Sequence, residues 1–235
     1  MVLPRGPSRP TAARRPGVGR TVLAAVMWML ALSFGLTSTS DAETTIDEVY
    51  ALVDRTPILK SDIHLFQLVG LTSPAREGET PAEYLSRSLD ARIRLELQYT
   101  DLVDSGSIHR LDINVAQEIE ALIARGGGRE VLQEGLAANG LNWEDLEALA
   151  LRTTASRAWV EQHLQPRISV SIEDIENAYQ TTFGDGDGAL TDNPPPLEEV
   201  RDELRQIIVA REVNLAIDRW LLQARQRLEV VRFHP

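Results

Sequence analysis

Start signals for helices recur along this chain, and they constrain its fold more than any other feature. Residues Thr80–Glu83 form a capping box with proline at the first helical position, and Ser171–Asp174 form a second box. Asn114 and Asn142 are typical N-cap residues of two further helices. Apolar residues follow each signal at a spacing of three or four, the period of an α-helix. The sequence therefore predicts a mainly α fold.

The predicted helices have stop signals as well. Glycines follow the helices that begin after Thr80 and Asn114, and Gly140 is expected to be the left-handed stop of a short helix. Ser61 is expected to cap the first helix, and the last and longest helix is interpreted as having one wide apolar face. Helices are expected over residues 62–69, 81–105, 115–125, 130–139, 143–165, 172–179 and 197–228.

Two short segments at opposite ends of this helical region have the composition of strands. Residues 46–53 alternate between apolar and polar, and a turn signal at 54–57 follows them, which indicates a hairpin with Ile58 and Leu59. Residues 229–233 contain β-branched and aromatic side chains. We expect these end segments to pair, because pairing would hold the last helix, folded back, against the first.

Residues 1–42 have the pattern of a secretory signal peptide. The segment 21–36 contains no charge, and the small residues Ser40 and Ala42 follow it at the spacing of a cleavage site. The bases that precede the apolar stretch are all arginines: Arg5, Arg9, Arg14, Arg15 and Arg20. We expect export to the periplasm with cleavage of this peptide. The alternative is a membrane anchor formed by 21–36, although this stretch is shorter than the roughly 20 residues that span a bilayer.

Charge and cysteine content exclude several classes of function. The chain has 235 residues and a net charge of −11, and the 193 residues after the predicted signal peptide carry −15. So acidic a chain is not expected to bind nucleic acid, which requires a basic face. The absence of cysteine excludes disulfides, thiolate metal sites and thiol catalysis.

No catalytic or cofactor motif occurs in the sequence. It contains no glycine-rich phosphate loop, no nucleophile elbow and no HExxH zinc motif. Adjacent carboxylates at 144–145, 173–174 and 198–199 lie in first turns of predicted helices, where the helix dipole favours acids. We therefore expect a binding protein without catalytic residues, cofactor or small-molecule substrate.

Metal binding is also not expected. Asp185, Asp187 and Asp192 resemble part of a cation loop, but Ala189 and Leu190 occupy the places where an EF-hand requires an oxygen ligand and a glycine. This segment is interpreted as a flexible acidic linker. The histidines inside predicted helices, His64 and His163, have no second ligand one turn away, and the helical tryptophans are expected to pack between helices: Trp143, Trp159 and Trp220.

Several segments together resemble the SurA family of periplasmic chaperones. Residues 46–63 resemble the family's opening strand, turn and first helix. Residues 111–180 resemble its N-terminal helical module, with Gly140–Trp143 at a helix junction and Val170–Tyr179 as the segment that leads into the family's isomerase domain. Residues 197–233 resemble the closing helix and strand. The resemblance implies a SurA-type chaperone module of residues 43–180 that is completed by residues 197–235.

The chain departs from this family at one place. Between the lead-in helix and the closing helix, the family carries one or two parvulin-type prolyl isomerase domains, whereas this chain has only residues 181–196. Sixteen residues are far fewer than the roughly 50 of a small domain. The segment is therefore interpreted as a linker, and isomerase activity is not expected. Prolyl isomerase would be only a label inherited from relatives.

The resemblance implies a binding function without a catalysed reaction. We expect an ATP-independent periplasmic holdase that binds unfolded outer-membrane protein precursors in an apolar cradle, whose residues the sequence does not identify. The alternative is a non-catalytic envelope adaptor that binds a folded partner, with a homodimer as one possible form.

Overall fold

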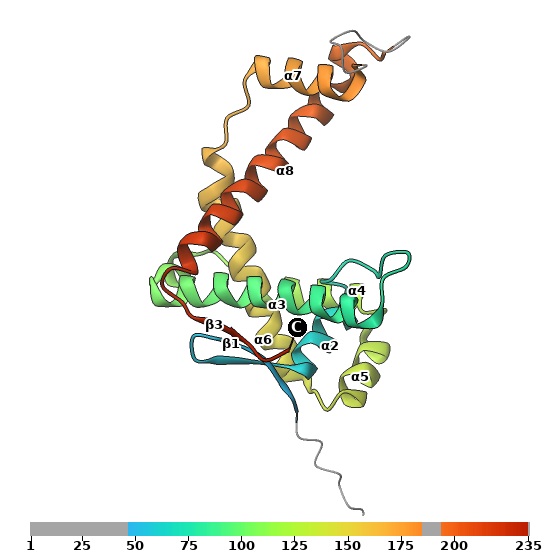
Figure 1. Ribbon diagram of the computed structural model, residues 1–235, viewed down its shortest axis with the longest axis vertical. Helices are drawn as coiled ribbons and strands as arrows, with labels where there is room; N and C mark the ends of the chain where they lie inside the picture. Colours follow the sequence, from blue (N-terminus) through green and yellow to red (C-terminus); the bar gives the residue numbers. More distant parts are fainter. Residues whose placement is uncertain (1–46, 185–193, 235) are drawn as a thin grey trace, which may run out of the picture. The chain divides into compact units, whose positions relative to one another are not determined.

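The computed structural model describes residues 47–184 and 194–234. Residues Ile46–Pro235 cluster into one compact unit, in which helices dominate and a small antiparallel sheet joins the two ends (Figure 1). The predicted mainly α fold is confirmed. The predicted signal peptide at 1–42 and Asp185, Asp187 and Asp192 of the predicted linker lie outside the described residues.

The elements follow one another in the order that the sequence predicts. They are β1 (Val49–Val53), β2 (Thr56–Leu59), α2 (Lys60–Leu68), α3 (Pro81–Asp104), a 3-10 turn (Ser107–Arg110), α4 (Val115–Arg125), α5 (Arg129–Ala138), α6 (Trp143–Trp159), a π-helical turn (Val160–Leu164), a 3-10 turn (Gln165–Arg167), α7 (Ile172–Phe183), α8 (Leu197–Ala224) and β3 (Val230–Arg232).

The sheet has the order β2-β1-β3, with both neighbours antiparallel to β1. Ala51 lies opposite Arg232, and the backbone N–H of Phe233 donates to the carbonyl of Tyr50 at 3.0 Å. In the hairpin turn, the N–H of Asp54 donates to the carbonyl of Glu229 at 2.7 Å. The expected pairing of the two end segments is therefore confirmed.

Most helix starts occur where the capping signals place them. The hydroxyl of Thr80 accepts from the N–H of Glu83, and the side chains of Asn114, Asn142 and Ser171 accept in the same way at their own helices. The expected cap at Ser61 is wrong, because α2 already begins at Lys60. The carboxylate of Asp62 accepts there from the N–H of Leu59 at 2.8 Å.

Three predicted helix ends differ from the structure by more than one residue. The α-helical part of 143–165 ends at Trp159 and continues as the π-helical turn, and Pro166, which lacks an N–H, lies in the 3-10 turn that follows. Helix α7 extends beyond the predicted end at 179 to Phe183, whose ring lies 5.1 Å from that of Tyr179. Helix α8 ends at Ala224, and Leu228 reaches the core from the turn after it.

Two large apolar clusters form what we call the body, which comprises the sheet, α2–α6 and the C-terminal half of α8. One cluster joins the sheet to α2, α3 and α8, and includes Ile58, Ile93 and Leu221. The other joins α2 through α6, and includes Phe66, Leu122 and Leu149. The body therefore contains most of the buried apolar side chains.

Helix α7 and the N-terminal half of α8 form what we call the arm (Figure 1). Its core is a separate cluster with four buried residues: Ile175, Tyr179, Leu204 and Ile208. The Tyr179 hydroxyl donates to the carbonyl of Pro195 at 2.7 Å. The arm is therefore a helical hairpin with its own small core.

Helix α8 buries different sides in its two halves. Leu204 and Ile208 face α7, whereas Leu221 and Ala224 face the body. At about 100° per residue, the two buried sides lie roughly 150° apart around the helix axis. The expected single wide apolar face is thus wrong, because the helix carries two apolar stripes on nearly opposite sides.

Candidate functional site

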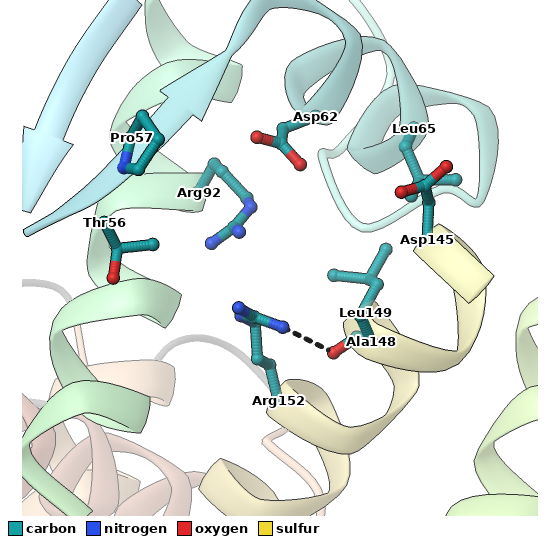
Figure 2. Close-up of a pocket in the computed structure, with 9 residues that line it drawn as sticks. All are labelled: Thr56, Pro57, Asp62, Leu65, Arg92, Asp145, Ala148, Leu149 and Arg152. Carbon is teal, nitrogen blue, oxygen red and sulfur yellow. Dashed lines mark hydrogen bonds between the residues drawn. The ribbon is translucent and has the colours of Figure 1, made fainter. Parts of the chain in front are cut away.

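A small polar cavity lies between β2, α2, α3 and α6 (Figure 2). Its volume is about 170 Å³, and charged side chains from three helices line it. They are Asp62 of α2, Arg92 of α3, and Asp145 and Arg152 of α6. Figure 2 shows both guanidinium groups directed into the space between the helices.

Each charged group of this cavity already has a structural partner. Arg92 and Arg152 donate to the same oxygen of the buried Glu96 carboxylate, at 2.8 and 2.9 Å, and Arg152 also donates to the carbonyl of Ala148. Asp62 and Asp145 accept from backbone N–H groups at the starts of α2 and α6. The cavity is thus the solvent side of an ion network that joins α3 to α6.

A second glutamate also binds two arginines, but with one carboxylate oxygen for each. Glu118 of α4 is buried and pairs with Arg125 of its own helix and with Arg157 of α6. Neither network was predicted from the sequence. The spacing of Arg92 and Glu96 at i, i+4 was an available signal, but this spacing is equally common on solvent-facing helices.

A larger and more apolar hollow runs along the middle of α8, which we call the α8 groove. Its volume is about 520 Å³, and its floor is formed by Val209, Ala210 and Val213. Four polar residues form its rim: Gln165, Arg205, Gln206 and Asn214. Gln165 comes from the 3-10 turn after α6, so the groove lies where the chain leaves the body for the arm.

The α8 groove is a consequence of the two stripes of α8. Val209 and Val213 lie on roughly the same side of the helix as the body-facing Leu221 and Ala224. The body covers this stripe only in the C-terminal half of α8. The stripe therefore continues beyond the edge of the body, with its valines half-buried and Ala210 exposed.

The remaining residues that the sequence singled out have structural roles. The carboxylate pairs 144–145, 173–174 and 198–199 all lie in first turns of helices. His64 Nδ1 lies 2.9 Å from the Asn139 side-chain oxygen, and the ring of His163 stacks on Trp159 at 4.0 Å.

The tryptophans contact other helices. Trp220 is buried in a cluster that includes Leu102 of α3 and Trp159, and its indole N–H donates to Asp101 at 2.8 Å. Trp143 packs at the edge of the α2–α6 cluster beneath the guanidinium of Arg129.

Neither a metal cluster nor a membrane-spanning helix is found in the part of the chain that the structure describes. Within residues 47–184 and 194–234, no group of three or more histidine, aspartate or glutamate side chains is arranged to hold a metal ion. No helix in the same ranges is long and apolar enough to cross a bilayer. The alternative anchor at 21–36 lies outside these ranges.

Comparisons of the chain with protein-family models and with curated proteins find no match.

Proposed function

We propose that this chain is an ATP-independent periplasmic holdase that binds unfolded outer-membrane protein precursors, as a SurA-like chaperone module. The observation that carries the proposal is the α8 groove, a mainly apolar hollow of about 520 Å³ along the middle of α8, which lies away from the pairing of β1 with β3 (Figure 1). Its floor is accessible, as the cradle of a holdase must be.

The composition of the groove suits an extended chain segment. Val209, Ala210 and Val213 can bury apolar side chains of a client, at roughly 25 cal/mol per Å² of apolar surface removed from water. The carboxamides of Gln165, Gln206 and Asn214 can both donate to and accept from a peptide backbone. A floor of three small side chains gives a modest affinity, so the client can be released without ATP.

The charge of the chain supports the same role. Residues 43–235 carry a formal charge of −15, and repulsion between such molecules keeps complexes with unfolded clients apart in solution. The periplasmic location follows from the interpretation of 1–42 as a cleaved signal peptide, with retention at the membrane through 21–36 as the alternative.

Suppression of aggregation tests the proposal. Residues 43–235 are mixed with a denatured β-barrel outer-membrane protein on dilution, and light scattering is followed. We expect suppression at stoichiometric amounts, and we expect Val213→Asp to weaken it, because the charge would occupy the apolar floor. The control is Val131→Asp, at an exposed valine of α5. Absence of suppression by the unmodified chain would contradict the holdase function.

Catalysis is not part of this proposal. Residues 181–196 offer no room for an isomerase domain, and the first three of them belong to α7. A proline-peptide isomerisation assay that gives a clear rate above background would overturn this exclusion.

A further inference from the structure

Three of the most exposed large apolar side chains lie along one side of α8. Ile207, Leu215 and Leu222 are 54%, 48% and 63% exposed. At about 100° per residue, they share an arc of roughly 80° with two charged residues, Arg211 and Asp218. We call these five residues the outer stripe.

The outer stripe is distinct from the α8 groove. Its centre lies roughly 150° around the helix from the groove floor at Val209, Ala210 and Val213. It begins at Ile207, beside the stripe that α7 covers at Leu204 and Ile208, and extends towards the C-terminal end of α8. The three apolar side chains alternate with the charged residues Arg211 and Asp218, so the stripe is a mixed surface in which the order of charges matters as much as the apolar area.

The order of residues along the outer stripe points to its partner. Two α8 helices that run antiparallel, with a two-fold axis between Asn214 and Leu215, place Ile207 opposite the partner's Leu222 and Arg211 opposite the partner's Asp218. We propose that the outer stripe binds a second copy of this chain in this antiparallel arrangement.

Two-fold symmetry makes the stripe complementary to itself. Each apolar contact and each ion pair occurs twice, as in isologous dimers. A parallel arrangement would instead place Arg211 against the partner's Arg211 and Asp218 against the partner's Asp218. Repulsion between these like charges selects the antiparallel orientation.

The charged residues of the stripe have partners within the chain that a dimer would have to replace, and Arg211 also lines a pocket with Asp174 of α7. Arg211 pairs with its neighbour Glu212 at 3.3 Å, and Asp218 pairs with Arg94 of α3 at 2.9 Å. Both pairs are largely exposed to solvent, where an ion pair contributes little. Their exchange for contacts with the partner therefore costs little. The α8 groove stays open in the dimer, because it lies on the other side of the helix.

Sedimentation velocity over a range of concentrations tests the proposal, with residues 43–235, which include the whole compact unit. We expect a reversible dimer. Leu222→Asp should weaken it by about tenfold or more, because each interface would bury an unpaired charge against Ile207. Val131→Asp, at an exposed valine of α5, should leave it unchanged. Circular dichroism shows whether each variant is folded.

A charge exchange tests the orientation. Arg211→Asp and Asp218→Arg should each weaken the dimer, and the double variant should restore it, since the pair re-forms with reversed signs. A dimer that Leu222→Asp leaves intact, or a double variant that stays as weak as the single ones, would overturn the proposal. A chain that is monomeric at every concentration, but loses suppression of aggregation through Leu222→Asp, would overturn it too and would assign the stripe to clients.

Discussion

Near each end of α8 one leucine is buried to nearly the same degree, but the two leucines lie in very different surroundings. Leu221 is 4% exposed and packs in the cluster that joins α2, α3, α8 and the sheet. Leu204 is 2% exposed and packs only within the arm, against α7. In addition, the body contains the two glutamate networks that join α6 to its neighbours. Two equally buried side chains can therefore belong to parts of the fold that unfold separately. We expect the arm to open independently of the body.

The largest effect is expected at the centre of the body. Glu96→Leu would leave Arg92 buried without its carboxylate, and we expect a loss of about 3–5 kcal/mol in the free energy of unfolding. Chemical denaturation followed by circular dichroism measures this loss.

The matched control removes all three charges of the network. Arg92→Met, Glu96→Leu and Arg152→Met together should restore most of the lost stability, because no buried ion is left unpaired. A triple variant no more stable than Glu96→Leu alone would show that shape, rather than the unpaired charge, causes the loss.

The same truncation at the two ends of α8 tests the comparison directly. Leu221→Ala should lower the global free energy of unfolding by about 2–5 kcal/mol, as cavities in a core do. Leu204→Ala should leave the global transition nearly unchanged and speed hydrogen exchange in α7 and in the N-terminal half of α8.

Hydrogen exchange with mass spectrometry separates the two outcomes. If Leu204→Ala lowers global stability as much as Leu221→Ala does, the arm and the body unfold as one unit and the distinction between them fails.

A smaller effect is expected at the second glutamate network. Glu118→Leu leaves Arg125 and Arg157 without their carboxylate, but both guanidinium groups are about half exposed and regain water. We expect a loss of about 1–3 kcal/mol by the same denaturation measurement. A loss as large as that of Glu96→Leu would show that exposure of the arginines does not set the cost.

The smallest effects are expected from acid titration. Hydrogen bonds from the Arg87 side chain, followed by one from the Arg76 N–H, lower the pKa of Glu79 from 4.5 to about 2. Its contribution to stability is complete above pH 4.5 and is lost as the pH falls towards about 2. Glu79→Gln should therefore flatten the pH dependence of body stability in this window.

The arm also contains a carboxyl group whose pKa is lowered. Hydrogen bonds from the Ser171 hydroxyl and N–H lower the pKa of Asp174 below its usual 3.8. The contribution of Asp174 to the arm is complete above pH 3.8 and is lost as the pH falls below this value. Asp174→Asn should therefore speed hydrogen exchange of α7 above pH 3.8, with a difference from the unmodified chain that shrinks at lower pH, and leave the global transition unchanged. A global change here would contradict the independence of the arm.

The parts of the fold that were predictable from sequence are those that local chemistry determines. Thr80, Asn114, Asn142 and Ser171 cap their helices because a side chain three residues or fewer from its backbone donor needs no tertiary partner. The pairing of β1 with β3 was also predictable, since both strands need a neighbour.

The candidate site was not predictable, because it depends on which side of a helix its neighbours cover. From the sequence, the apolar residues of α8 were interpreted as one face. In the structure, α7 and the body bury nearly opposite sides of this helix. The same limit applies to Glu96 and Glu118. Their burial is decided by the approach of α6, which supplies Arg152 and Arg157 from more than 35 residues away.

The central position of β1 in the sheet has a consequence for the order of folding. Ala51 and its partner Arg232 are roughly 180 residues apart, so this pairing closes a very long loop and belongs to the late, slow steps of folding. Until β3 arrives, one edge of β1 is an open template for strands of other molecules. A chain interrupted before Val230 would keep this open edge permanently, and we expect it to aggregate even though its helices can form.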